Sequence, residues 1–250
     1  STNQERDLNT RKDFDLYTAP LSNKKTGVLQ IGPKQNREKK GSTSMQREEG
    51  FIATIFEDNN VQTKAQRAKG WIDISDTSKG ISVGIKNFLQ EYPKELEIDP
   101  KTNTVNAYVW PVSIDPMSFE RKNTKLDGEM LDNFAQGTTK TTEFIYYFHA
   151  KEKIDNIYLT MDYVLDPPIA HASPEWYTAS KVYGNMAPYS TKFPEFENAL
   201  QYKYDWIAFN QEWESWFGIF DFGDIKTNYF NDEWHMWNNN EPTVDFSLWT

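Results

Sequence analysis

Between residues 50 and 165 the chain carries one run of strand-forming residues after another, and no long helical pattern separates them. The runs are rich in Val, Ile, Thr, Tyr and Phe and end at Gly, Asn, Asp or Pro, as strands and their turns do. Successive strands of this kind predict antiparallel sheets, and two sheets packed face to face bury both inner faces. The predicted strands cover 51–56, 71–74, 81–85, 94–98, 104–110, 141–148 and 156–165.

Prolines between 167 and 194 break the strand pattern and mark a boundary in the chain. Proline cannot donate a ladder hydrogen bond, so a segment rich in it is expected to link two parts rather than to continue a sheet. We therefore predict an antiparallel β-sandwich domain at 1–168, a linker at 169–194 and a helical segment at 195–250.

The helical segment is expected to begin at Pro194. Proline is tolerated in the first turn of a helix, and Glu195 and Glu197 favour the positive end of the helix dipole. Apolar side chains then recur on two faces, which predicts a helix buried between neighbours, and Gly218 is its expected end. Because few residues follow, we expect a truncated helical domain.

Charge and cysteine usage narrow the class of function. The 250 residues carry a net charge of −10, which argues against a general nucleic-acid surface because phosphate binding requires clustered Lys and Arg. No apolar run approaches the roughly 20 residues of a membrane-spanning helix. Without cysteine, neither a disulfide nor a thiolate metal site is possible. We expect a secreted or periplasmic bacterial protein that needs no cofactor.

The stretch 202–249 concentrates aromatic and acidic side chains. It holds six of the nine tryptophans, and the last fifty residues carry nine acidic side chains against two basic ones. Three consecutive amides, Asn238, Asn239 and Asn240, follow Trp237. A hydrophobic core does not need these amides, whereas flat rings beside hydrogen-bonding groups are how a protein holds a sugar. The stretch is therefore predicted to form one wall of a carbohydrate site.

Two groups of motifs stand out along the chain. The first comprises GWIDISD at 70–76, GISVGI at 80–85 and QEYPKELE at 90–97, and the second comprises FGIFDFGD at 217–224 and WNNNE at 237–241. Together they resemble bacterial polysaccharide lyases related to ulvan lyases and exo-rhamnogalacturonan lyase-like proteins. The resemblance implies a β-sandwich followed by the beginning of an (α/α) toroid, acting by β-elimination on an acidic polysaccharide of algal or plant origin.

A lyase that cleaves beside a uronic acid has to neutralise the carboxylate before a base removes the neighbouring proton. Amides, histidines or cations serve the first task, and tyrosine, histidine or lysine serves the second. The catalytic candidates are His149, His235, Tyr229 and Asn239. The substrate-binding candidates are Trp234, Trp237, Asn238, Asn240 and Arg121.

The acidic wall repels an anionic polymer unless basic groups face it. The candidates for that positive charge are Lys94, Arg121, Lys122 or the remainder of a larger enzyme. We also expect His149, at the end of a predicted strand, to line one groove together with the three asparagines.

The residues leave two other functions open. The carboxylate pair of a glycoside hydrolase is available among Glu212, Glu214, Asp221 and Asp224. A non-catalytic glycan-binding module needs only the aromatic surface. The acids next to His235 match no metal-site spacing, so no metal is predicted. The expected partner is an acidic polysaccharide rather than nucleic acid or membrane, and the oligomeric state is left open.

Overall fold

The computed structural model describes residues 23–32, 50–58, 60–117, 125–126, 129–130, 138–213, 216–220, 222–228 and 235–238. For 125–126, 129–130, 212–213, 226–228 and 235–238 it describes the backbone alone. Most of the ordered elements in this part of the chain are antiparallel strands, which confirms the prediction of a β-rich fold.

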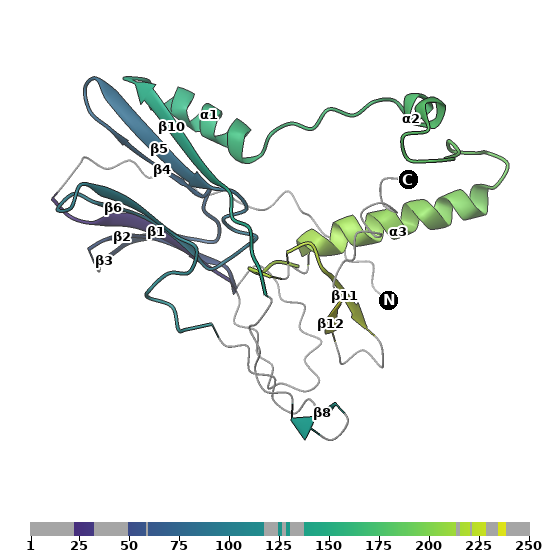
Figure 1. Cartoon of the computed structure of the whole chain (residues 1–250), viewed down its shortest axis with the longest axis horizontal. Coiled ribbons are helices and arrows are strands. Elements are labelled where there is room, and N and C mark those ends of the chain that lie inside the picture. The colour runs from purple at the N-terminus through teal and green to yellow at the C-terminus, as the bar shows by residue number, and fades with distance from the viewer. Residues whose placement is uncertain are drawn as a thin grey trace.

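Two antiparallel sheets contain most of the strands that the structure describes (Figure 1). The five-stranded sheet has the order β3-β2-β1-β6-β7, with bounds Asn60–Ala65, Ile52–Glu57, Thr26–Ile31, Lys94–Asp99 and Thr104–Tyr108. The three-stranded sheet has the order β10-β5-β4, with bounds Phe144–Ala150, Lys79–Ile85 and Trp71–Ser75. A small ladder joins β8 (Lys125–Leu126) to β9 (Glu129–Met130).

The main core lies between the two sheets. Val28, Ile55 and Leu96 enter it from the five-stranded sheet, and Val83 and Ile85 enter it from β5. Each of these side chains is buried, and each lies two residues from another inward-facing position, as strand alternation requires. The predicted face-to-face packing of two sheets is therefore present in the described residues.

The turn between β4 and β5 forms where the sequence predicts turn chemistry. Asp76 Oδ1 accepts hydrogen bonds from the backbone N–H groups of Ser78 (2.6 Å) and Lys79 (2.9 Å). These bonds favour the ionised carboxylate and lower the pKa of Asp76 to about 2. The residues of the turn themselves supply these hydrogen bonds.

The last predicted strand, 156–165, is wrong, because these residues form helix α1 (Ile154–Leu165). Their Ile, Tyr, Thr and Val favour strands, but Ile157, Met161 and Leu165 are spaced by four and form one helical face. That face packs on Trp71 of the three-stranded sheet. The absence of a side chain at Gly84 makes space for Met161, since a Cβ at position 84 would lie 3.0 Å from Met161 Cε. Tertiary packing overrides strand propensity here.

Helix α3 (Pro194–Trp213) begins at the predicted proline and carries Glu195 and Glu197 in its first turn. Its end, at Trp213, precedes the predicted stop at Gly218. The prediction that both faces are buried is wrong, because Phe196, Leu200, Tyr202, Tyr204 and Trp206 are all exposed. Within the described residues no second helix packs on α3, so most of its apolar surface stays in solvent (Figure 1).

The segment after α3 is attached to the end of the sandwich. Phe217 is buried between Phe51 (ring centroids 6.1 Å apart) and Phe222 (5.8 Å), beside Leu89. The N–H of Gly218 donates to the carbonyl of Gln90 at 2.7 Å. These contacts hold the C-terminal end of α3 near the turn that precedes β6.

Beyond α3, residues predicted to be helical form the hairpin of β11 (Ile225–Asn228) and β12 (His235–Asn238). Helix α2 (Pro174–Ser180) lies inside the predicted linker. None of the helices in the described part of the chain is long and apolar enough to cross a membrane.

Candidate functional site

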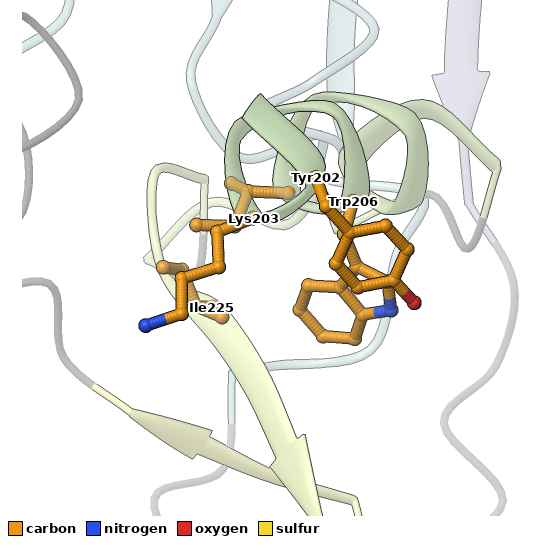
Figure 2. A pocket seen from close by; sticks show the side chains of 5 residues that line it. Tyr202, Lys203, Trp206 and Ile225 are labelled. Atoms are coloured by element: carbon orange, nitrogen blue, oxygen red, sulfur yellow. The ribbon is translucent and has the colours of Figure 1, made fainter. Parts of the chain in front are cut away.

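An open pocket of about 300 Å³ lies between α3 and β11 (Figure 2). Its lining comprises Tyr202, Lys203, Trp206, Ile207 and Ile225. Four of these residues come from α3, where positions three and four apart share a face. Ile225, at the start of β11, closes the other side.

The pocket combines two flat rings with the aliphatic parts of Lys203, Ile207 and Ile225. Figure 2 shows the rings of Tyr202 and Trp206 next to each other, with Lys203 and Ile225 across the opening. The indole of Trp206 packs edge-to-face with the buried Trp216, with ring centroids 5.8 Å apart, and this contact supports the Trp206 ring. Rings present an apolar face to a sugar, and an ammonium group attracts a carboxylate. The lining is almost wholly apolar, so the pocket suits the apolar face of a ring-shaped ligand, with the Lys203 ammonium outside it.

The hairpin pairs the strand that carries part of the predicted site with the strand that begins at the pocket. In the β11–β12 ladder the backbone of Asn238 is opposite Ile225, Trp237 is opposite Lys226, and His235 is opposite Asn228. The structure thus places two predicted substrate-binding residues and one catalytic candidate on the strand that pairs with a pocket-lining strand. Tyr229, Asn239, Trp234, Asn240 and Arg121 lie outside the described residues.

The residues proposed for a hydrolase pair are only partly described. Glu212 is on α3, where only its backbone is described, and Asp224 precedes β11. Glu214 and Asp221 lie outside the described residues. Among the described residues, no three acidic or histidine side chains converge as metal ligands do.

His149, the first catalytic candidate, lies on β10 with its side chain fully buried. Its Nε2 is 2.9 Å from Asp73 Oδ1, and its Nδ1 is 2.8 Å from the carbonyl oxygen of Ala150. Asp73 Oδ1 also accepts a hydrogen bond of 2.7 Å from the Ser82 hydroxyl. Tyr147 stacks on the imidazole at 5.2 Å. These contacts give His149 a structural role. Its catalytic role remains a prediction.

The predicted groove shared by His149 and the asparagine run is not formed in the described structure. His149 is the second-last residue of β10, whose arrowhead lies at the opposite side of the molecule from β11 and β12 (Figure 1). Gly80 explains why the ring turns inward, since a Cβ at that position would lie 2.3 Å from His149 Cε1. The imidazole fills the space that this glycine leaves.

The stability of the His149–Asp73 pair is expected to depend on pH. Burial by itself lowers the pKa of His149, but the hydrogen bonds to Asp73 and Ala150 and the charge of Asp73 outweigh it and raise the pKa above 6.5. Both ring nitrogens face acceptors, so both are satisfied only in the cation. The folded state therefore binds this proton more tightly than the unfolded chain does, and the pair stabilises the fold most below pH 6.5.

We expect this stabilisation to disappear as the pH rises from 6.5 through the raised pKa of His149. Urea unfolding of the wild type and of His149→Gln, from about pH 5 to about pH 9, measures it. The difference in unfolding free energy between the two proteins should shrink with increasing pH. A difference that stays constant over this range contradicts the assignment of the cation.

Lys94, one of the basic residues named as facing an anionic polymer, is not accessible to one. It is fully buried at the end of the sandwich core, with its Nζ 3.4 Å from the carbonyl oxygen of Val109. Burial lowers the pKa of Lys94 to about 8, against the opposing charge of Glu91. A lysine that does line an opening is Lys203, which lies with Tyr202 and Ile225 inside the predicted wall 202–249 but is not among the named candidates. The signal was present in the four-residue spacing of Tyr202 and Trp206, which was assigned to a buried helix face.

No protein-family model matches the chain. It is similar to the uncharacterized protein YetA of Bacillus subtilis (strain 168), with 24% identity over 205 residues. The aligned part covers 73% of this chain and 24% of the Bacillus protein, so the chain spans about a quarter of the length of the relative it matches.

Proposed function

We propose that this chain belongs to a polysaccharide lyase that cleaves a uronate-containing polysaccharide, with the pocket between α3 and β11 as a sugar subsite. The pocket carries the proposal, because the rings of Tyr202 and Trp206 line an opening of about 300 Å³ and Lys203 lies across it. The choice of β-elimination as the reaction rests on the motifs at 70–97 and 217–241, which resemble those of polysaccharide lyases. On the same resemblance, α3 is the first helix of an (α/α) toroid in a secreted enzyme.

In this proposal different residues perform the separate steps of β-elimination. Tyr202 and Trp206 hold the sugar ring, and the Lys203 ammonium neutralises the uronate carboxylate, which makes the proton on the adjacent carbon easier to remove. A base takes that proton, the electron pair forms a carbon–carbon double bond, and the glycosidic C–O bond breaks with protonation of the leaving oxygen. His235, on β12, and Tyr229, which follows β11 in the sequence, are the candidates for the base.

The test is turnover of uronate polysaccharides, ulvan and rhamnogalacturonan included, followed by the ultraviolet absorbance of the unsaturated product. Sugar release without that absorbance indicates a glycoside hydrolase. Binding without release indicates a glycan-binding module. Failure to bind any of these polymers contradicts the assignment of the pocket.

Replacing Trp206 by alanine should weaken binding of these polysaccharides about tenfold or more, as truncation of an aromatic anchor does. Lys203→Gln should weaken binding of acidic polymers but not of neutral ones, because it removes only the charge. The matched controls are Phe196→Ala and Lys192→Gln, exposed residues of the same types that lie outside the pocket. Isothermal titration calorimetry measures all four variants, and equal losses in variants and controls would exclude the pocket.

A further inference from the structure

Three aromatic rings alternate along the edge strand β10. Phe144, Tyr146 and Phe148 are 37%, 59% and 75% exposed, whereas the residues between them turn toward α1. Large rings exposed at every second position on one strand face form a continuous flat surface. We call these three residues together with Lys79 the β10 shelf.

The topology explains why the shelf is uncovered. Opposite Phe144, Tyr146 and Phe148 on β5 are Ile85, Val83 and Ile81, which face the core between the sheets. In that core β4 faces β6 and β5 faces β7, and β7 is the edge of the five-stranded sheet. Strand β10 therefore extends past the facing sheet, within the part of the chain that the structure describes. The rings continue the core face into solvent.

The shelf also carries positive charge at one end. Lys79 on β5 is paired with Ala150, which follows Phe148 by two residues on β10. Lys79 therefore lies on the same face of the sheet as the three rings. Its side chain is exposed, and among the described residues it makes no ion pair. The charge of Lys79 also acts on the nearby Asp76 carboxylate. Flat apolar rings followed by this exposed ammonium group complement a ligand with apolar ring faces and carboxylates.

We propose that the β10 shelf is a second glycan-binding surface, which takes an extended chain of an acidic polysaccharide along the strand. A strand rises about 3.3 Å per residue, so successive rings stand about 6.6 Å apart and all three span about 13 Å. That length suits several linked sugars rather than one. The inference rests on the proposed function only for the class of polymer, because the shelf and the α3 pocket share no residue.

The experiment uses the full chain and affinity electrophoresis in gels that contain polygalacturonate or ulvan. Tyr146→Leu/Phe148→Leu keeps apolar surface but removes the flat rings, and it should weaken retardation about tenfold or more. Tyr163→Leu/Tyr189→Leu, a pair of exposed rings elsewhere, should migrate as the wild type does. Lys79→Gln should weaken retardation by acidic polymers and leave retardation by a neutral glucan unchanged. Far-ultraviolet circular dichroism confirms that each variant is folded.

Several results overturn the proposal. Unchanged retardation of Tyr146→Leu/Phe148→Leu does so, because rings that hold a glycan cannot be replaced by leucine without loss. A wild-type dimer in sedimentation that dissociates in Tyr146→Ala/Phe148→Ala assigns the surface to contact between copies instead. Trp206→Ala separates the two sites: if it abolishes lyase product while retardation persists, the shelf is supported independently. Absence of lyase product in the wild type with retardation intact removes the proposed reaction and leaves the shelf.

Discussion

Replacing Asp73 by alanine is expected to lower the free energy of unfolding by about 3–5 kcal/mol, the cost of breaking a buried ion pair. Asp73 accepts hydrogen bonds from His149, Ser82 and Ser75, and its side chain is only 10% exposed. Alanine leaves the imidazole and the Ser82 hydroxyl buried without this acceptor, and a buried donor without a partner pays its full desolvation cost. Urea unfolding followed by circular dichroism measures the change.

Asp73→Asn and Asp115→Ala are the matched controls for this variant. Asparagine keeps one oxygen acceptor but loses the charge, so its cost should lie between those of the wild type and alanine. Asp115 is exposed in the loop after β7, and its substitution should change stability by no more than about 0.5 kcal/mol. An Asp73→Ala protein as stable as Asp115→Ala would falsify the role of this network.

Phe217→Ala is expected to cost about 3–5 kcal/mol and to free the C-terminal segment from the sandwich. Phe217 is 2% exposed and contacts Phe51, Leu89 and Phe222, so alanine leaves a cavity at the junction. The same junction fixes the end of α3 and hence the position of Trp206 and Lys203. We therefore expect weaker polysaccharide binding as well as a lower free energy of unfolding.

Phe220→Ala provides the comparison for Phe217→Ala. It removes a ring of the same size from the same segment, but that ring is 38% exposed, so its loss should cost clearly less than the loss of Phe217. Limited proteolysis reports the freed segment directly, since cleavage between α3 and β11 should be faster in Phe217→Ala alone. Equal stability and equal cleavage rates in the two variants would show that Phe217 does not hold the junction.

The strands β4 and β5 could be predicted because their information is local. Ile72 and Ile74 on β4, and Ile81, Val83 and Ile85 on β5, alternate with other residues, and Asp76 closes the turn between the strands through bonds to its own neighbours. The start of α3 is equally local, since Pro194 and the two glutamates that follow act within one turn. Such features depend on residues a few positions apart, so they can be predicted without knowledge of the rest of the fold.

The features that were predicted wrongly or missed depend instead on contacts between residues far apart in the chain. Strand propensity at 156–165 was overridden because Met161 and Ile157 pack on Trp71, far away in the chain. His149 was predicted to open into a cleft, but its partner Asp73 lies 76 residues earlier and draws it inside. The α3 pocket needs Ile225 from a strand that the sequence assigned to a helix.

The sequence by itself determined that this chain forms antiparallel sheets, that a helix begins at Pro194, and that rings and amides gather toward the C-terminal end. Only the tertiary structure decided which rings are buried and which remain available to a ligand. Trp216 is 1% exposed, whereas Trp206, in contact with it, lines the open pocket. The reason is that burial depends on neighbours from distant parts of the chain, and no local spacing specifies which of those neighbours arrives.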